Sequence, residues 1–459
     1  MNTPRSTGIA LLVLDVAATV VVFNVVTHFR GLGVAEHFIL DPLKWPIAAI
    51  IFAIYLIDGY KARTDMLSVD YTSQHSIALL GALGATLLFT FAFNPAGYEL
   101  QTSRGVIAFS FLALIPLTLG YRRLIYPVVL SSRGEHCLVF LGDRSSCLAF
   151  RVECKKMGMT QPVVFTVVSE ESAVPFAPDD SSDRLRPFSE VLDALQNGRL
   201  NIEAIILRES ARELPTDISQ RLVELYFSGV PTYTLELFHQ VYWQKIPLYR
   251  LNQTWLFQEG FQIAREPVFE RLKRASDIAL SAFGLLLASP LILIGALAVW
   301  LGDHGPIFFF QTRIGKNHLP FRLVKLRTMR VEPTDGDLYT QPSDPRITRV
   351  GHFLRSSRLD ELPQLWNVLR GDMSLIGPRA EWDRLVANYE REIPCYNFRH
   401  LVKPGITGWA QVNYPYGANM EDTLRKLEYD LYYIRHFSFM LDASIVLKTI
   451  HIMLFGKGR

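Results

Sequence analysis

Cysteines, charged residues and the common nucleotide- and metal-binding motifs are scarce in this chain of 459 residues. The four cysteines have neither the CxxC spacing of a zinc site nor the density of a disulfide scaffold, which indicates reduced thiols and a cytoplasmic setting for the soluble parts. The sequence contains no HExxH helix, Walker-type glycine loop or GxSxG elbow. It also has no long basic stripe, so nucleic acid is not an expected partner.

The composition is instead rich in apolar residues. Hydrophobic residues make up 49% of the chain and charged residues 20%, proportions that predict a membrane protein with soluble parts. A chain of this length is too long for one ordinary domain. The formal net charge of +3 is small, but basic residues gather beside the apolar segments, which favours contact with anionic membrane lipid.

Apolar runs occupy much of the first 131 residues. They are Ile9 to Phe29, Trp45 to Ile57 (extendable from Leu43 to Tyr60), Ile77 to Phe93 and Gly105 to Gly120. Because about 20 residues cross a bilayer, residues 1–131 are expected to form a four-helix transmembrane domain. The alternative is a set of core helices in a large soluble protein, which fits poorly with runs this long and this poor in charge.

Basic residues beside these runs predict the orientation of the bundle. One side would carry Arg5, Lys61, Arg63, Arg122, Arg123 and Arg133, and the other side Arg30, Lys44 and Arg104. Loops rich in lysine and arginine stay in the cytoplasm. Both ends of the bundle are therefore expected to be cytoplasmic.

Residues 132–246 change to short β-rich runs that alternate with helical stretches. The runs are Leu138 to Leu141, Val163 to Val168, Ala204 to Leu207 and Val230 to Leu235. This alternation predicts a small doubly wound, Rossmann-like α/β domain. A dinucleotide-binding turn needs several glycines after the first strand, and only Gly142 is present. A structural, oligomerising or regulatory role is therefore favoured over NAD or FAD binding.

After a linker over 247–270, the apolar segment 276–301 has Ser289 and Pro290 in its middle. Proline removes a backbone hydrogen bond and should kink the helix. Basic residues precede and follow the segment, so both of its ends are expected on the cytoplasmic side, as in a re-entrant helix that breaks at Ser289-Pro290. The alternative is an ordinary proline-kinked transmembrane helix, whose two ends would lie on opposite sides of the membrane.

Two adjacent carboxylates, Asp360 and Glu361, precede an amphipathic helical pattern that includes Trp366 and that Gly371 would end. Pro363 is best tolerated in a first helical turn, which puts Asp360 near the N-cap, where backbone N–H groups favour anions. Adjacent helical residues point about 100° apart, so one carboxylate can attack phosphorus while the other holds a cation. The alternative makes Asp360 a simple cap and Glu361 a solvated surface residue.

Basic residues near this pair favour a role in phosphate chemistry. They are Arg313, Lys325, Arg327, Arg355, Arg379 and Lys403. Guanidinium groups bind phosphate oxygens in bidentate fashion. Each of these residues could instead meet anionic lipid, and the glycine-containing turn at Lys403 could be purely structural.

From about Arg271 to the C-terminus, the sequence resembles the catalytic domain of bacterial polyprenyl-phosphate hexose-1-phosphate transferases, the monotopic phosphoglycosyl transferases. The matching strings, in the family's order, are KRASDIALS, ASPL, GPIFFFQTRIGK, FRLVKLRTM, DPRITRVGHFLRSSRLDELPQLWNVLRGDMSLIGPR, KPGITGWAQVN and LEYDLYYI. The whole layout resembles the long members that initiate exopolysaccharide, capsule or O-antigen synthesis. The resemblance implies an α-rich catalytic domain over 271–459, anchored by the re-entrant helix.

The resemblance also implies a reaction. Asp360 would be the nucleophile, Glu361 would coordinate Mg²⁺ together with Asp360, and Arg355 and Arg379 would bind phosphate. A hexose 1-phosphate would pass from a UDP-sugar to undecaprenyl phosphate through an aspartyl phosphosugar, with release of UMP, at the cytoplasmic face of the bacterial inner membrane. Membrane lipid is then a partner, and a homodimer is one of the oligomeric states left open.

Other functions stay open at this point. A glycosyltransferase would make a glycosidic bond and release UDP, whereas a membrane scaffold or regulator would keep the fold without the chemistry. A transporter fits less well, because the four N-terminal runs carry few charges, Asp15 being the main exception.

Overall fold

The structure, a computed structural model, describes residues 4–29, 39–61, 64, 66–67, 69–93, 104–134, 136–159, 161–167, 185–197, 200–208, 214–248, 267–330, 344, 346–414 and 419–455. The chain divides into two compact units, Met1–Gln244 and Lys245–Arg459. The four-part division drawn from the sequence stays a prediction. Most of the predicted linker over 247–270 lies outside the described residues.

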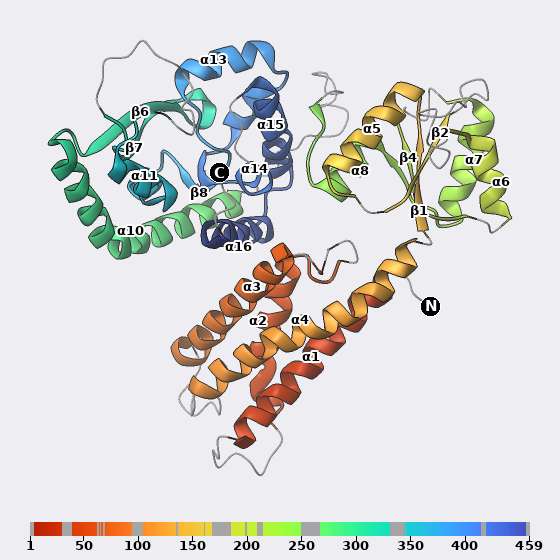
Figure 1. Cartoon of the computed structure of the whole chain (residues 1–459), viewed down its shortest axis with the longest axis horizontal. Helices are drawn as coiled ribbons and strands as arrows, with labels where there is room; N and C mark the ends of the chain where they lie inside the picture. The colour runs from red at the N-terminus through yellow and green to blue at the C-terminus, as the bar shows by residue number, and fades with distance from the viewer. Residues whose placement is uncertain are drawn as a thin grey trace. The chain divides into compact units, whose positions relative to one another are not determined.

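Within the described part of the first unit, four helices form a bundle (Figure 1). They are α1 (Pro4–Phe29), α2 (Lys44–Leu56, after the 3₁₀ turn Asp41–Leu43), α3 (Val69–Leu88, followed by the π-helical turn Phe89–Phe93) and α4 (Arg104–Gly134). Helix α1 packs on α2 and α4, and α3 packs on the same two helices. The described stretches long and apolar enough to cross a membrane are Thr7–Phe29, Tyr71–Ala92, Arg104–Pro127 and, in the second unit, Val268–Gly302. The protein is therefore a membrane protein, as its composition predicts.

The second helix of the bundle is shorter than the sequence suggested. Helix α2 has 13 residues and ends before a turn at Ile57, so the predicted helical extension to Tyr60 is wrong. Thirteen residues rise about 20 Å, less than the roughly 30 Å of a bilayer core.

Arg122 also differs from its predicted place. The sequence predicts it in a loop together with Arg123, but both lie inside α4, and Arg122 is fully buried. Of the other basic residues that predicted the orientation, Arg30 and Arg63 lie outside the described residues, as do the side chains of Arg5 and Arg133.

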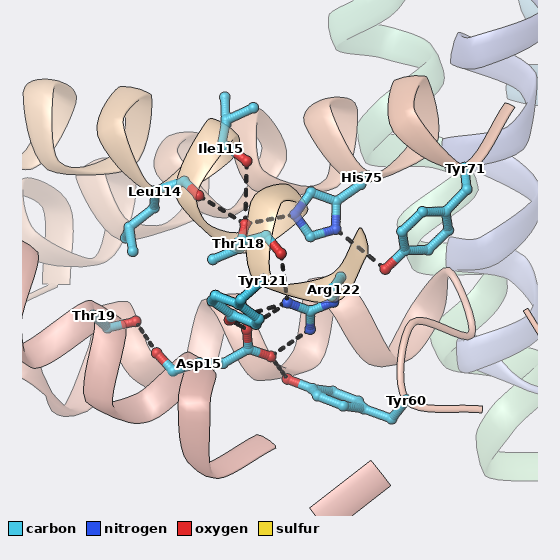
Figure 2. A network of polar contacts seen from close by, with 10 residues as sticks. All are labelled: Asp15, Thr19, Tyr60, Tyr71, His75, Leu114, Ile115, Thr118, Tyr121 and Arg122. Atoms are coloured by element: carbon cyan, nitrogen blue, oxygen red, sulfur yellow. Dashed lines mark hydrogen bonds and ion pairs between the residues drawn. The ribbon is translucent and has the colours of Figure 1, made fainter. Parts of the chain in front are cut away.

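A polar network holds the bundle together around Asp15 (Figure 2). Arg122 donates from Nη1 and Nη2 to the two carboxylate oxygens of Asp15, at 2.7 and 2.6 Å. The Tyr60 hydroxyl donates to Asp15 Oδ2 at 2.7 Å. Nearby, His75 Nε2 lies 2.7 Å from Thr118 Oγ1 and joins α3 to α4. Since Asp15 and Arg122 are both buried, each charge depends on the other for compensation.

The described residues of the first unit also form a parallel sheet in the order β3-β2-β1-β4-β5. Its strands are β1 (His136–Leu141), β2 (Val163–Val167), β3 (Arg186–Pro187), β4 (Asn201–Leu207) and β5 (Thr232–Thr234). The predicted parallel α/β sheet is confirmed, with Val168 outside the described residues.

Side chains alternate between the two faces of this sheet, as expected for a strand period of two. Leu138 and Phe140 pack with α5 (Arg144–Lys156) and α8 (Leu235–Phe238). Val139 and Leu141 pack on the opposite face with α6 (Phe188–Gln196) and α7 (Thr216–Phe227), and Figure 1 shows the two helix layers.

The turn after β1 is filled by side chains of the protein itself. Asp143 is the N-cap residue of α5 and pairs with Arg208. A Cβ on Gly142 would lie 3.0 Å from Phe140 Cε1 and 3.2 Å from Arg208 Cβ. Because a carboxylate sits at the helix start, where a dinucleotide would place its pyrophosphate, this turn favours a structural role.

The second unit is mostly helical. Its helices are α10 (Pro267–Asp303), α11 (Arg349–Ser356), α12 (Gln364–Arg370), α13 (Asp383–Glu392), α14 (Trp409–Asn413), α15 (Met420–Arg435) and α16 (Phe439–Phe455). Strands β6 (Phe308–Ile314) and β7 (Pro320–Leu326) form an antiparallel hairpin, and β8 (Ser374–Ile376) pairs in parallel with β9 (Gly405–Thr407). Buried Tyr396, Trp409 and Tyr433 belong to one core that α13, α14 and α15 share.

Helix α10 bends without being interrupted. It runs through Pro290 as one helix of 37 residues, so the predicted break at Ser289-Pro290 is replaced by the bend that Figure 1 shows. Pro290 cannot donate to the carbonyl of Leu286, and the Ser289 hydroxyl donates to that carbonyl at 2.8 Å instead. The serine therefore satisfies the acceptor that the proline leaves.

Candidate active site

Helix α10 fixes the framework of the site through three residues of the KRASD string. Arg274 donates to the carbonyls of Val368 and Leu369 at 2.6 and 2.8 Å, at the C-terminal end of α12. Asp277 Oδ1 accepts hydrogen bonds from Ser374 Oγ at 3.1 Å and from a backbone N–H of β8. Lys273 pairs with Asp442 of α16 at 2.5 Å. These charges therefore position elements within the second unit, Lys245–Arg459.

Asn367 fastens α12 to the β6–β7 hairpin. Its Oδ1 accepts from the Val324 N–H at 3.1 Å and its Nδ2 donates to the Arg322 carbonyl at 2.8 Å. Asn367 is buried, whereas Trp366, which the pattern placed on an apolar face, is 54% exposed. Asn367 thus hydrogen-bonds α12 to β7, the strand that carries Lys325.

The two carboxylates lie in a short 3₁₀ turn, Leu359–Glu361, between α11 and α12. Arg358 enters this turn in the left-handed region with φ 58°. The N-cap of α12 is Pro363, so the prediction that Asp360 lies near the N-cap is wrong. The predicted end of the helix at Gly371 is confirmed, with φ 103° at that residue.

Asp360 is a buried carboxylic acid. Its side chain belongs to a residue only 7% exposed, and among the described residues Oδ1 finds no hydrogen-bond partner. Burial, with the charge of Glu361, raises the pKa of Asp360 to about 6, although Lys325 and Arg355 oppose the rise. The carboxylate is therefore ionised at neutral pH, with one oxygen available to react.

The pKa of Glu361 is shifted in the opposite direction. Arg379 Nη2 donates to its Oε1 at 3.2 Å, and Arg358 Nη1 lies 3.7 Å from the same oxygen. Burial works against ionisation, but Arg379, Arg358 and Lys325 together lower the pKa of Glu361. Two neighbouring acids whose pKa values are pushed apart are suited to different tasks.

Several of the predicted basic residues surround this pair. Burial and the charges of Arg313 and Arg379 lower the pKa of Lys325 to about 8. Burial likewise lowers the pKa of Arg313 to about 10, although Glu381 opposes the shift. Arg355 lies on α11, where its Nε donates to a threonine hydroxyl at 2.9 Å. The structure therefore brings Arg313, Lys325, Arg355 and Arg379 into one electrostatic group with the acids.

Two predicted residues make other contacts. Arg327 is buried and donates from Nε to the Pro306 carbonyl at 2.6 Å, beside Gly305. Lys403 lines a separate cavity of about 410 Å³ together with Arg274 and Asp277. Burial and the charge of Arg274 lower the pKa of Lys403.

A buried arginine that no sequence motif indicated supports the site. Arg399 donates from Nη2 to the Arg379 carbonyl at 2.8 Å and to Asp430 Oδ2 at 3.0 Å, and from Nη1 to the Tyr396 hydroxyl at 2.6 Å. It therefore holds the backbone of the residue that pairs with Glu361. Asp430 in the string LEYDLYYI could have indicated this arginine, because an acid among apolar helical residues usually has a buried basic partner.

The site thus holds a buried carboxylate with one oxygen that no described residue hydrogen-bonds, a neighbouring acid with a lowered pKa, and a group of cations. Cations arranged in this way bind phosphoryl oxygens and offset the charge that develops during displacement at phosphorus. The arrangement is suited to nucleophilic attack on a phosphate.

Comparisons with known proteins agree with this chemistry. Residues 268–456 match the family described as bacterial sugar transferase. UDP-N-acetylgalactosamine-undecaprenyl-phosphate N-acetylgalactosaminephosphotransferase of Aeromonas hydrophila is 38% identical over 269 residues, which cover 58% of this chain and 63% of the relative. UDP-glucose:undecaprenyl-phosphate glucose-1-phosphate transferase of Escherichia coli K12 is 48% identical over 185 residues, 39% of each chain.

A shorter relative is matched over nearly its whole length. The exopolysaccharide production protein PSS of Rhizobium leguminosarum bv. phaseoli is 42% identical over 195 residues, 41% of this chain and 98% of the relative. In contrast, the chain spans less than two thirds of the first two relatives. The comparisons give no support to a homodimer. Since the match covers the carboxylate pair and its cations together with almost all of a relative, this chain belongs to the bacterial sugar transferase family.

Proposed function

We propose that this protein transfers a hexose 1-phosphate from a UDP-sugar to undecaprenyl phosphate and releases UMP, as the first membrane step of surface polysaccharide synthesis. The observation that carries the proposal is Asp360, a buried carboxylate whose Oδ1 has no hydrogen-bond partner within the described chain. It lies beside an ionised Glu361 and close to Lys325 and Arg355.

The reaction would proceed in two displacements at the same phosphorus. Asp360 attacks the β-phosphorus of the UDP-sugar, an O–P bond forms, and the bond to the UMP oxygen breaks. A phosphate oxygen of undecaprenyl phosphate then attacks the aspartyl phosphosugar and frees the carboxylate. Lys325, Arg355 and Arg379 would offset the charge on the phosphoryl oxygens in both steps.

The carboxylates also fit a magnesium ion. Mg²⁺ prefers oxygen ligands and commonly binds through one or two carboxylates together with substrate phosphates. Asp360 Oδ1 is an unpaired oxygen among the described residues, and Glu361 is held ionised beside it. When bound, the ion would neutralise part of the diphosphate charge.

The membrane arrangement is part of the proposal. We infer that α10 enters one leaflet, bends and returns, and that the site faces the cytoplasm at the inner membrane of a bacterium. The bend of α10 and the exposure of apolar side chains on both sides of Pro290, with Leu286 71% and Leu293 69% exposed, support this arrangement. Such an anchor would hold the acids at the depth of the lipid phosphate.

The released nucleotide tests this function. Membranes containing the protein receive a panel of UDP-sugars with undecaprenyl phosphate, and UMP and UDP are both quantified. At least one UDP-sugar should yield UMP, Asp360→Asn should abolish the release, and Asp217→Asn in the α/β region should retain it. Release of UDP would identify a glycosyltransferase, and full activity of Asp360→Asn would favour a scaffold whose acid is not the nucleophile.

A second measurement addresses the intermediate. Without acceptor lipid, the wild-type protein should release about one equivalent of UMP per active site and retain labelled sugar in a bond that hydroxylamine cleaves, as expected for an acyl phosphate. UMP release that depends strictly on acceptor lipid, with no retained label, would exclude the aspartyl route.

A further inference from the structure

Three side chains that the proposed reaction does not use converge in the catalytic unit. His318 comes from the 3₁₀ turn Lys316–His318 between β6 and β7, Glu390 from α13, and His400 from the 3₁₀ turn Tyr396–Leu401. Their candidate ligand atoms all lie within 4.8 Å of one another. Glu390 Oε1 is 3.3 Å from His318 Nδ1 and 4.0 Å from His400 Nε2.

The imidazole of His400 is buried, and one of its ring nitrogens has no hydrogen-bond partner among the described residues. His400 is 4% exposed, and no described residue forms a hydrogen bond with its Nε2. The 4.0 Å to Glu390 exceeds hydrogen-bond length, so a buried ring nitrogen points at the cluster without a partner. Buried polar atoms in this state are uncommon and call for an explanation.

We propose that His318, Glu390 and His400 bind one divalent transition-metal ion of the Zn²⁺ type. Bonds of 2.0–2.1 Å in a tetrahedral site place neighbouring ligand atoms about 3.3 Å apart. His318 Nδ1 and Glu390 Oε1 already have that separation, and His400 Nε2 would approach Glu390 Oε1 by about 0.7 Å, with all candidate ligand atoms within 4.8 Å of one another. Imidazole ligands favour such metals over Mg²⁺, which prefers oxygen alone.

The charges around the cluster are compatible with a cation. Burial, with the charge of Arg399, lowers the pKa of His400 to about 3, so the ring is neutral, as a metal ligand must be. Arg399 is the nearby opposing charge, and it is paired with Asp430 at 3.0 Å and with Glu381 at 3.6 Å. The side chains of His318 and Glu390 are 50% and 32% exposed, which provides an entry path.

The ion would link three segments that lie far apart in the sequence. One of them, Tyr396–Leu401, carries Arg399, which holds the Arg379 carbonyl. A metal at His400 would therefore stabilise the segment whose Arg399 holds the backbone of Arg379, the residue that pairs with Glu361. We assign the metal a structural role. The competing explanation is a plain His318–Glu390 hydrogen bond beside a packed core histidine, which predicts no specific metal binding.

Zinc titration of the full-length protein tests the site. A chelator first removes bound metal from the protein. Zn²⁺ is then titrated in a buffer that contains excess Mg²⁺ and no sugar nucleotide. One equivalent should bind and raise the unfolding temperature, because a ligand that binds only the folded state stabilises it. His318→Ala and Glu390→Gln, both at exposed positions, should each weaken binding at least about 100-fold.

His352→Ala removes an exposed histidine of α11 and is the matched control, which should bind zinc as the wild type does. X-ray absorption should find only nitrogen and oxygen ligands, which excludes binding at the thiols. Absence of stoichiometric binding, unchanged affinity in both His318→Ala and Glu390→Gln, or sulfur in the ligand shell would each overturn the proposal. None of these outcomes bears on UMP release.

Discussion

Replacement of Asp360 by asparagine should stabilise the catalytic unit while it abolishes transfer. The pKa of Asp360 is about 6 instead of its ordinary 3.8, which corresponds to about 3 kcal/mol against the ionised form. Asparagine has nearly the same size and no charge, so Asp360→Asn removes that cost at pH 8. For a domain of 150–250 residues, a gain of about 3 kcal/mol raises the unfolding temperature by roughly 6–12 °C.

The effect should depend on pH in a defined direction. The pKa of Asp360 is higher in the folded state than in the unfolded state. The free-energy cost of its buried charge is therefore complete above about pH 6 and disappears as the pH falls through 6 towards 3.8. The unfolding temperatures of wild type and Asp360→Asn should therefore differ most at pH 8 and converge as the pH falls towards 3.8. Thermal unfolding followed by tryptophan fluorescence in lipid nanodiscs measures both values.

Glu361→Gln is a control that should change the unfolding temperature in the opposite direction. The pKa of Glu361 is lowered, because Arg379 and Arg358 outweigh the burial cost, so its charge contributes stability above its ordinary pKa of 4.5 that is lost as the pH falls. This variant should unfold at a lower temperature than the wild type at pH 8. If Asp360→Asn is no more stable than the wild type at pH 8, or if its advantage does not change with pH, the assignment of Asp360 as a strained, functional acid is refuted.

Other consequences of the structure can be tested in the same preparations. Lys325→Met removes a charge that lowers the pKa of Asp360, so the acid limb of kcat/KM for UMP release should move to higher pH, whereas Arg330→Met at an exposed position should not move it. Asp15→Asn leaves Arg122 buried without its counter-charge and should destabilise the bundle by about 3–5 kcal/mol, measured by thermal unfolding. The double variant Asp15→Asn/Arg122→Met should recover most of that loss, and a double variant as unstable as the single one would contradict the ion-pair explanation.

Local patterns in the sequence predicted the kinds of secondary structure in most of the chain. The short apolar run Leu138 to Leu141 predicted a strand of an α/β sheet, and the structure places its side chains in the two cores that flank the sheet. Lengths of apolar runs predicted membrane helices because bilayer thickness sets a minimum length. The weaker predictions concerned ends and breaks, such as the extension of α2 to Tyr60 or the interruption at Pro290, where capping and side-chain hydrogen bonds decide the outcome.

The acidic pair and a possible division of its roles were also visible in the sequence, but the opposite pKa shifts of the two acids were not. The adjacency of Asp360 and Glu361 and the nearby arginines indicated a phosphate site. The raised pKa of Asp360 and the lowered pKa of Glu361 arise from burial and from residues brought in by other elements, Lys325 from β7 and Arg379 from the segment after β8. The distances between these charged groups are set by the packing of separate elements, so no local sequence pattern predicts them.

The sequence by itself thus determined the kinds of elements, the membrane character and the presence of a phosphate-type motif, since these follow from composition, periodicity and spacing along the chain. Tertiary structure alone decided which charges meet: it paired Arg122 with Asp15 inside the bundle and linked Arg399 to the backbone of Arg379. It also placed Lys403 at a cavity that neither acid lines. The physical reason is that the energy of a buried charge depends on its partner in space, and that partner can lie anywhere in the chain.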